Sequence, residues 1–190
     1  MSQIQIIDHN TAWEAEFKQI ALSLRETVGE HAERIDHIGS TAVPKLAAKD
    51  IIDIQISVSE LANTEVIDLL LSVGYVSVEN LADNLVGAPS DSEELMKRFV
   101  RQPEGQRRTH IHIREVGRLN QIYPLLFRDY LRNNSIVRDA YQIVKMELAE
   151  RFTNDSKSYY AIKDPYMDTV YEAAKSWAEI NNWHPDPNFH

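Results

Sequence analysis

The stretch IIDIQISV, residues 51–58, restricts the fold more than any other part of the chain. Side chains in a strand alternate between its two faces. One face of this strand is therefore expected to be aliphatic, formed by Ile52, Ile54, Ile56 and Val58. Asp53 and Gln55 lie on the opposite face, out of the apolar layer. The pattern thus predicts a strand that carries one carboxylate on its polar side.

The other segments change from strands to helices along the chain. Further strands are predicted at residues 4–7, 34–38, 75–79, 95–101 and 109–115, the last two as a hairpin. Helices are predicted from Thr11 to Gly29, over 43–48 with Pro44 in the first turn, over 61–73, and in three segments after residue 120, the last beginning at Asp164-Pro165. A run of strands followed by a run of helices indicates an α+β fold.

A single domain is expected from the length of the chain. With 190 residues and 43% hydrophobic side chains, the chain can bury one core, and it is shorter than chains that usually form two domains. We place this domain at residues 1–181. Residues 182–190, NWHPDPNFH, are predicted to form a frayed C-terminal tail.

Charge and composition exclude several classes of protein. The chain has 20 Lys and Arg against 29 Asp and Glu, a formal net charge of -9, which argues against binding duplex nucleic acid or an anionic membrane surface. The absence of cysteine excludes disulfides, thiolate metal sites and cysteine nucleophiles. The N-terminal sequence lacks the features of a signal peptide, and no run of about 18 apolar residues is present. A soluble cytoplasmic protein is therefore expected.

Gly39 and Ser40 lie between a predicted strand and a predicted helix start, and Asp53 follows on the next strand. Small residues allow the backbone to approach a phosphate, and a helix N-terminus supplies free N–H groups. A strand carboxylate can hold a divalent cation, here Mg²⁺ or Mn²⁺, that bridges to the same phosphate. The alternative is an ordinary turn in which Ser40 caps the helix and Asp53 is a structural carboxylate.

A Gly-Ser pair followed by an aspartate on the next strand resembles the signature of the nucleotidyltransferase (DNA polymerase β-like) superfamily. Across residues 4–178 the order of the motifs resembles the GrpB family, which is the more specific match. These motifs are HIGSTAV, LAAK, IIDI, HIHIRE and LLFRDYLRNN, then Tyr160 and Lys163 ahead of a last helix with Trp177. The resemblance implies a nucleotidyltransferase-like fold, with a mixed β-sheet, flanking helices and a helical C-terminal part. Some members are fused to dephospho-CoA kinase, which implies a link to coenzyme A metabolism.

The chain departs from the superfamily signature at Gln55. Two-metal nucleotidyl transfer needs two or three carboxylates, because the attacking oxygen and the leaving phosphate must both be neutralised. Glutamine is a poor Mg²⁺ ligand beside a carboxylate, and the strand that could supply another acid presents His110 and His112 instead. Whether the protein is an enzyme is therefore open: a metal-dependent nucleotidyltransferase would have an incomplete set of carboxylates.

His110 and His112 share one face of the strand THIHIRE. With Asp53 they could complete a metal site of two histidines and one carboxylate, so these three residues are the candidate metal ligands. Asp53 and His112 are the candidate catalytic residues. The alternative is two half-exposed histidines on a sheet face, and in either case we expect both to line the cleft. His37 could join them, although a strand histidine bonded to the backbone is more common.

The dense basic stretch of the chain lies around the predicted hairpin and contains Lys97, Arg98, Arg101, Arg107, Arg108 and Arg114. An anionic substrate is expected here, unless the stretch is a solvated hairpin. The candidate phosphate-binding residues are Gly39, Ser40, Thr41, Arg98, Arg107, Arg108 and Lys163, of which Lys163 is singled out by the family resemblance. Arg128 and Asp129 match the family motif and are expected to fix a helix by a salt bridge.

Three functions are compatible with these residues. The first is binding of a nucleotide or a phosphorylated small molecule with a divalent metal at Asp53, with nucleotidyl transfer if the protein is an enzyme. The second is a non-catalytic module that binds a ligand or stabilises a partner. The third is a hydrolase in which a metal on Asp53, His110 and His112 activates water.

Overall fold

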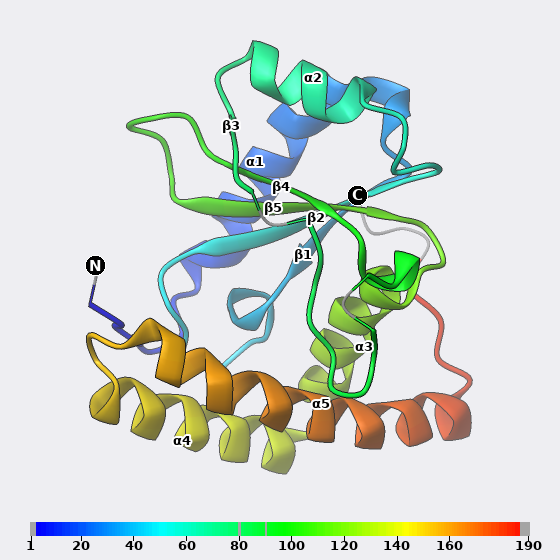
Figure 1. The fold of residues 1–190 in the computed structure, drawn as a ribbon. Helices are drawn as coiled ribbons and strands as arrows, with labels where there is room; N and C mark the ends of the chain where they lie inside the picture. The colour runs from blue at the N-terminus through cyan, green and yellow to red at the C-terminus, as the bar shows by residue number, and fades with distance from the viewer. Residues whose placement is uncertain (1–2, 80, 90, 187–190) are drawn as a thin grey trace.

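In the described part of the chain, five strands form one mixed sheet in the order β1-β2-β5-β4-β3 (Figure 1). The computed structural model describes residues 3–79, 81–89 and 91–186. The strands are β1 (Arg34–Ile38), β2 (Ile52–Val58), β3 (Val76–Ser77), β4 (Arg98–Arg101) and β5 (Thr109–Glu115). The α+β class and the β4–β5 hairpin are confirmed. The predicted strand at 4–7 is reduced to one bridge between Ile7 and Ala48.

The register of the sheet decides which side chains meet. β2 and β5 run parallel, and the other neighbouring strands are antiparallel. Asp53 lies beside His110 in this register, and Gln55 lies beside His112. On its other side Asp53 pairs with Ile38, the last residue of β1. The end of β1, Asp53 and His110 therefore gather at one end of the sheet.

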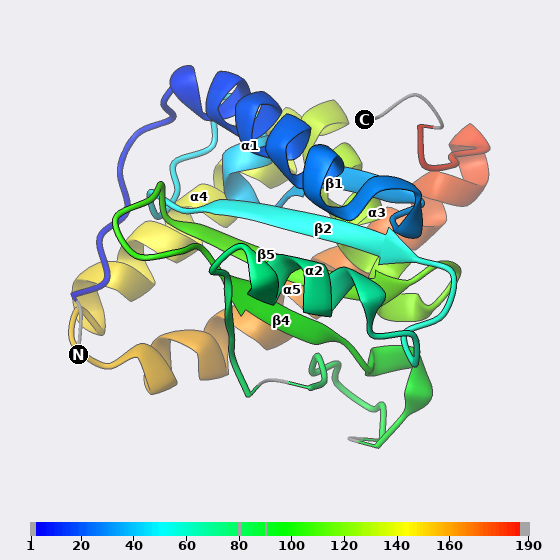
Figure 2. The same ribbon diagram turned by 90° about the horizontal axis from the view of Figure 1, so that it is seen from above.

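Helices cover both faces of the sheet. They are α1 (Ala12–Val28), α2 (Glu65–Ser72), α3 (Leu119–Asn133), α4 (Ser135–Arg151) and α5 (Ser156–Asn181), with 3₁₀ turns η1 (Gly29–His31), η2 (Ser40–Ala42) and η3 (Glu93–Leu95). Figure 2 shows α1 and α2 over one face, with α4 and α5 beyond the other. The apolar face of β2 packs into the core under α1, in a cluster that includes Trp13, Phe17, Leu24, Ile52, Ile54 and Ile56. No described helix is both long and apolar enough to cross a membrane.

The polar face of β2 is covered by the helical second half of the chain. α3 contacts β1 and β5, and α5 packs on α3 and α4, so that α4 and α5 form a separate layer (Figure 1). A second apolar cluster joins the three helices to the segment before β2; it includes Val43, Leu46, Leu126, Tyr130, Tyr141 and Tyr171. The functional residues predicted on β2 and β5 therefore face this helical part.

The short helix predicted over residues 43–48 is wrong. The chain after Gly39 makes only the 3₁₀ turn η2, and Val43 is already extended. Lys45 has a φ of 67°, a left-handed conformation that a right-handed helix does not accommodate. Pro44 thus lies in a turn and does not open a helix.

The start predicted for the last helix is also wrong. α5 begins at Ser156, nine residues before Pro165, and the side chain of Asp155 accepts a hydrogen bond from Ser158 N at 3.0 Å. A proline inside a helix removes one backbone hydrogen bond. Here the packing of α5 on α3 and α4 outweighs that loss. The earlier start places Tyr160 and Lys163 on the helix itself.

Part of the predicted C-terminal tail is docked on the domain. Trp183 Nε1 donates to Asp129 Oδ2 at 3.1 Å, and the Trp183 side chain packs against the second apolar cluster. The prediction of a frayed tail is therefore wrong for this residue. Residues 187–190 lie outside the described part of the chain.

Candidate functional site

The turn after β1 brings Gly39 against the side chain of Asp53. Gly39 has a φ of 70°, a conformation that favours glycine. A Cβ atom at this position would lie 2.5 Å from Asp53 Oδ2 and 2.9 Å from Asp53 Cβ. Glycine is therefore required here for the carboxylate of β2 to lie against the backbone of the turn.

Ser40 is bonded to a lysine from the helical part of the chain. Lys145 of α4 is only 2% exposed, and its Nζ donates to Ser40 Oγ at 2.9 Å and to the Ala47 carbonyl at 2.6 Å. Burial, together with the nearby charge of Lys163, lowers the pKa of Lys145 to about 7. An anion bound beside this amine would restore its full charge. The amine is thus suited to a phosphate ligand.

A pocket of about 120 Å³ lies beside Ser40 and Asp53. Its lining contains three lysines, Lys49, Lys145 and Lys163; we call it the lysine pocket. Lys49 Nζ donates to Tyr160 OH at 2.9 Å, and Lys163 Nζ lies 2.6 Å from Asp164 Oδ1. Three amino groups, together with the hydroxyls of Ser40 and Tyr160, around a small pocket form an anion-binding arrangement.

The positive charge of the lysine pocket comes from side chains and not from a helix N-terminus. The helix predicted after Gly39-Ser40 is a single 3₁₀ turn, too short to build a helix dipole. Although burial opposes the charge of Lys163, its pKa is raised because Tyr141 and Asp164 favour the charged form. Lys163 therefore carries a full charge at neutral pH.

Asp53 is the acid of the lysine pocket. Its side chain is 30% exposed, and Oδ1 lies 3.3 Å from His110 Nδ1. Among the residues that the structure describes, no group of three or more His, Cys, Asp or Glu side chains is placed to hold a metal ion. Mg²⁺ can be held by one protein carboxylate when phosphates and waters supply the other ligands. The residues thus fit one cation that arrives with a phosphate, whereas the predicted set of Asp53, His110 and His112 is not assembled.

Gln55 belongs to the scaffold. It is completely buried, its Nε2 donates to the Gln121 carbonyl at 3.0 Å, and its Oε1 accepts from Arg114 at 2.7 Å. Gln121 donates in turn to Ser57 Oγ at 3.1 Å. These bonds fix α3 on the polar face of β2. The side chain at position 55 is therefore occupied, and the residues present do not fit a two-metal site.

Replacing Gln55 by aspartate is expected to destabilise the protein without adding a metal ligand. A carboxylate cannot donate to the Gln121 carbonyl, and the change buries a charge. We expect the free energy of unfolding in urea to fall by about 2–3 kcal/mol and the Mn²⁺ affinity in calorimetry to stay unchanged. Ser57→Ala, which removes one bond from the same network, should cost about 1 kcal/mol. A stable Gln55→Asp protein with tighter Mn²⁺ binding would show that position 55 reaches the site.

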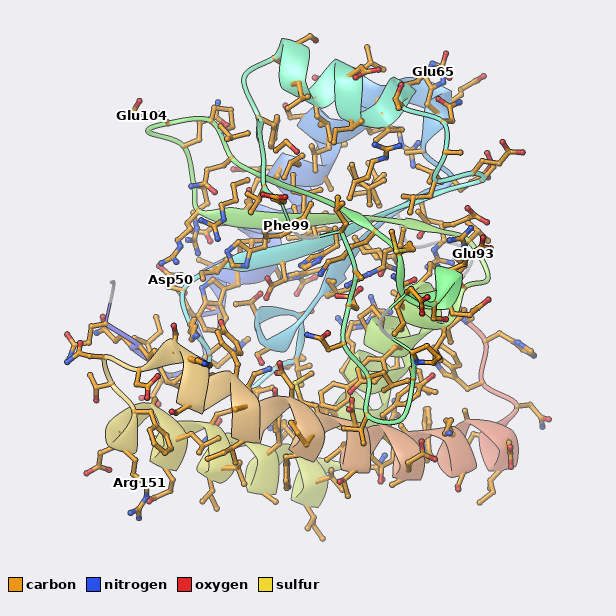
Figure 3. The ribbon with its side chains drawn as sticks, viewed as in Figure 1. Asp50, Glu65, Glu93, Phe99, Glu104 and Arg151 are labelled. Carbon is orange, nitrogen blue, oxygen red and sulfur yellow. The ribbon has the colours of Figure 1, made fainter. Side chains whose placement is uncertain are left out.

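A wider cleft of about 640 Å³ shares Asp53 and Lys163 with the lysine pocket. Its floor is formed by β4 and β5, with Lys97, Phe99, Arg101, His110, His112 and Arg114. Phe99, labelled on the sheet in Figure 3, has its ring centroid 5.3 Å from that of His110 and 4.8 Å from that of His112. The opposite wall comes from α3 and α5, with Asn120, Tyr123, Met167 and Asp168.

His112 lines this cleft in its neutral form. Burial and the charges of Arg114 and Lys97 hold its pKa well below the usual value. Its Nδ1 lies 3.4 Å from a guanidinium nitrogen of Arg114. A neutral imidazole can accept a proton or a hydrogen bond from a ligand. His112 therefore lies where the sequence predicted it, although apart from any metal cluster.

Arg98, predicted to bind phosphate, lies on the other face of the sheet. It pairs with Ile113 in the register of β4 and β5, and paired residues share a face. Its guanidinium donates to the Leu61 carbonyl at 3.0 and 3.2 Å. The residues that line the cleft here are Phe99 and Arg101 of β4 and Lys97, which directly precedes the strand. Because side chains alternate along a strand, the basic residues that face the cleft are the sequence neighbours of Arg98 and not Arg98 itself.

Arg107 and Arg108 also lie outside the cleft, on the connection between β4 and β5. Arg107 forms ion pairs with Glu16 and Asp50, which fixes the connection against α1. Arg108 is exposed. Neither residue lines the lysine pocket or the wider cleft. Figure 3 labels Glu104 on the same connection, at its outer tip.

His37 and Thr41 mainly serve the core. His37 stacks on Phe17 with ring centroids 4.6 Å apart, and burial lowers its pKa to about 3. Thr41 Oγ1 lies 3.0 Å from His37 Nε2 and donates to the Ile51 carbonyl at 3.2 Å. Thr41 touches the lysine pocket, but its hydroxyl is already bonded. His37 does not join the cleft.

The predicted salt bridge in LLFRDYL is confirmed. Arg128 Nε lies 2.7 Å from Asp129 Oδ1. Arg128 also donates to the His37 carbonyl at 2.9 Å, and it is only 1% exposed. The residue thus connects α3 to β1.

Lys145 is the site residue that sequence reasoning missed. The sequence pattern could have identified it, because Tyr141, Lys145 and Leu148 share the buried face of α4. A lysine therefore interrupts an apolar stripe. Such a lysine must have a buried partner. Lys49 carried a weaker signal as the last residue of the LAAK motif.

Comparisons with known proteins agree with this architecture. Residues 3–173 match the family described as GrpB protein. The chain is 36% identical over 196 residues to a Mycobacterium leprae protein named dephospho-CoA kinase, covering 94% of this chain and 48% of that protein. It is 33% identical over 174 residues to UPF0157 protein SCO7215 of Streptomyces coelicolor, covering 90% and 84%. The crystal structure of conserved protein GrpB from Enterococcus faecalis superimposes with a TM-score of 0.74 at 28% identity, covering 91% of this chain and 99% of that one.

The chain spans about half the length of the first curated relatives it matches, which are mycobacterial proteins named dephospho-CoA kinase. Their name describes the whole of those longer proteins. The family match, in contrast, runs from residue 3 to residue 173 and includes the sheet, the lysine pocket and most of α5. The chain therefore belongs to the GrpB family.

Proposed function

We propose that the protein binds the phosphate groups of a nucleotide, or of another phosphate-bearing small molecule, in the lysine pocket together with Mg²⁺ or Mn²⁺. One observation carries the proposal: three lysines surround a pocket that also contains Ser40 and the carboxylate of Asp53. Lysines alone suit any anion. A carboxylate beside them repels an anion unless a cation lies between the two, so this combination favours a metal-bound phosphate.

Each residue of the pocket has a role in this proposal. Ser40, Lys145 and Lys163 hold the phosphate oxygens, and Asp53 holds the cation. His110 orients the Asp53 carboxylate from 3.3 Å. When bound, the cation neutralises phosphate charge and positions the group. The wider cleft then holds the rest of the ligand.

Nucleotidyl transfer is the reaction that we propose if the site is catalytic. The Gly39-Ser40 turn beside Asp53 resembles the nucleotidyltransferase signature, and the family resemblance supports that fold. Neutral His112 in the adjoining cleft can accept a hydrogen bond from an attacking hydroxyl or amine and so orient it. The lysines supply electrostatic stabilisation of the transferring phosphate. Because Asp53 is the single carboxylate among the described residues that line the lysine pocket, this version does not use two protein-held metals.

A non-catalytic binding module is the second candidate. It is favoured by Gln55, which is buried in the scaffold where a transferase would present a second acid. Incubating the protein in a cell extract with each of the four nucleotides labelled at the α-phosphate separates the two candidates. Label on an acceptor would identify a transferase, whereas binding without transfer would identify the module.

The relatives named dephospho-CoA kinase suggest coenzyme A and its precursor as further candidate ligands. Coenzyme A and dephospho-CoA both carry phosphate groups that the lysine pocket could hold. They therefore belong in the first ligand screen beside the nucleoside triphosphates. A link to coenzyme A metabolism predicts that one of them outcompetes ATP.

Asp53→Asn is expected to abolish the metal-dependent part of ligand binding. The amide keeps the shape of the side chain but removes the charge that holds the cation. With wild type, a ligand at about 100 times its Kd raises the stability by roughly 2.7 kcal/mol. We expect Mg²⁺ or Mn²⁺ to enlarge that thermal shift for wild type and to leave the shift of Asp53→Asn unchanged. Thermal-shift titration of nucleotides and both coenzymes, with and without metal, measures this.

Asp50→Asn is the matched control for this experiment. Asp50, labelled in Figure 3, lies just before β2 and lines neither cavity. Its variant should keep the metal-dependent shift. If none of the ligands shifts wild type, or if Asp53→Asn keeps its response to metal, the proposed phosphate site is wrong.

A further inference from the structure

The wider cleft has a second group of cations at the end of β4 and β5 away from Asp53. Lys97 and Arg114 point into this part of the cleft, and their side chains are only 4% and 6% exposed. Buried cations require a counter-ion. That counter-ion is Asp83, which comes from the segment before β4.

The Asp83 carboxylate is held at both oxygens. Oδ1 accepts from Lys97 Nζ at 2.5 Å, and Oδ2 accepts from Arg114 Nε at 2.9 Å and from Asn120 Nδ2 at 3.3 Å. Although burial opposes its charge, the pKa of Asp83 is lowered because Arg114 and Lys97 favour the carboxylate. The group of Lys97, Arg114 and Asn120, which we call the carboxylate cradle, is thus built around one carboxylate.

Two features indicate that the cradle serves a ligand as well as Asp83. The side chain of Asp83 is 23% exposed, so it lies between the buried cations and solvent. Asn120 is only 3% exposed, and its Oδ1 has no hydrogen-bond partner among the described residues. Asn120 lines the cleft. A buried acceptor without a protein partner on the lining of a cleft is a place where a ligand donor can bind.

We propose that the carboxylate cradle binds the carboxylate of a small hydroxy acid or amino acid, whose neighbouring hydroxyl or amino group donates to Asn120 Oδ1. In the absence of this ligand Asp83 occupies the cradle in its place. Because the cradle and Asp53 lie in one cleft, the ligand is the second substrate of the site. The role of second substrate rests on the proposed function, whereas binding of a carboxylate in the cradle does not.

A tethered carboxylate competes with a free one. A short tether gives Asp83 an effective concentration on the order of millimolar or more, so wild type is expected to bind small carboxylates weakly. Removing the Asp83 carboxylate removes the competitor and leaves two buried cations unpaired. The variant Asp83→Ala should therefore bind acetate about tenfold or more tightly than wild type does.

The experiment measures rescue of Asp83→Ala by added anions. Melting temperatures are recorded in acetate, glycolate and phosphate, each at constant ionic strength made up with chloride. We expect acetate to raise the melting temperature of the variant but not of wild type, glycolate to raise it further through Asn120, and phosphate to raise it less. If Asp83→Ala does not fold in any of these salts, Asp83→Asn is titrated in the same way with the same expected order.

Two double variants locate the effect. Asp83→Ala with Lys97→Met should lose the response to acetate, because half of the cradle's charge is gone. Asp83→Ala with Lys145→Met should keep it, because the lysine pocket is not involved. The proposal is overturned if chloride rescues as well as acetate, if phosphate rescues best, if the Lys97→Met background still responds, or if the Lys145→Met background does not. Failure of nucleotide binding at Asp53 would leave these results unchanged.

Discussion

Gly39→Ala is expected to lower the free energy of unfolding by about 3 kcal/mol and to abolish metal-dependent ligand binding. With a φ of 70° at this position, an added side chain costs about 1–2 kcal/mol. Its Cβ would also lie 2.5 Å from Asp53 Oδ2, and relief of such a contact costs about 1–3 kcal/mol. The other close atoms are Cβ and Cγ of Asp53, near the backbone of β2. Relief therefore moves the whole side chain of Asp53, the proposed cation ligand.

Gly105→Ala separates the cost of the positive φ angle from the cost of the close contact with Asp53. Gly105 has a φ of 77°, but a methyl group added there would have nothing within 4 Å, so its alanine variant should lose only about 1 kcal/mol and keep ligand binding. Urea unfolding measures the stability of both variants, and calorimetric titration with Mn²⁺ and a nucleotide measures binding. Equal effects of the two substitutions, or full binding by Gly39→Ala, would refute the close contact between the turn and Asp53.

Lys145→Met is expected to weaken nucleotide binding by about 10- to 100-fold while leaving the protein folded. A hydrogen bond to a charged group contributes about 1.5–3 kcal/mol, which corresponds to that range of affinity. Methionine fills a similar volume between α4 and the turn, and the buried charge disappears with the lysine. Nucleotide titrations of both proteins at pH 7 measure the difference.

The same substitution is expected to change how stability depends on pH. In the unfolded chain a lysine keeps its proton up to about pH 10.5, whereas burial lowers the pKa of folded Lys145 to about 7. Between these values the unfolded state binds more protons, so the free energy of unfolding rises with pH. We expect wild type to gain about 2 kcal/mol relative to Lys145→Met between pH 7 and pH 9. Below pH 7 both states hold the proton, and the two curves should run parallel.

Lys175→Met is the control for both measurements. Lys175 lies on α5 in an exposed ion pair with Glu172 and lines neither cavity. Its variant should keep wild-type affinity and the wild-type pH profile. If Lys145→Met binds nucleotide as tightly as wild type does, the lysine pocket is not the phosphate site. If its stability follows pH as wild type does, Lys145 is charged in the folded protein.

The sheet and half of the site were predictable because they depend on local patterns. A period of two along β2 is enough to place Asp53 and Gln55 on the polar face, and the hairpin follows from two strands and a turn between them. In β4, whose two faces are both covered, the same period of two cannot predict which of the adjacent basic residues faces the cleft. Arg98 was therefore chosen in place of its neighbours Lys97 and Arg101.

The rest of the site depends on contacts between distant parts of the chain. Lys145 meets Ser40 across 105 positions, and no local pattern reports such a contact. The sequence predicts a helix start at Pro44 and another at Pro165, although Pro44 lies in a turn and Pro165 lies inside α5. Proline restricts its own backbone, but tertiary packing decides whether a helix extends through it.

The lysine pocket is built from two parts of the chain that have separate apolar clusters. Asp53 lies on β2 and Ser40 in the turn after β1, whereas Lys145 and Lys163 belong to the helices α4 and α5. A ligand that contacts both parts binds only when the helices are docked on the sheet. By mass action, a higher ligand concentration would therefore stabilise the docked arrangement. Occupancy of the pocket would thus strengthen the docking of these helices on the sheet, because a bound anion would lie beside the mutually repelling amino groups of Lys145 and Lys163.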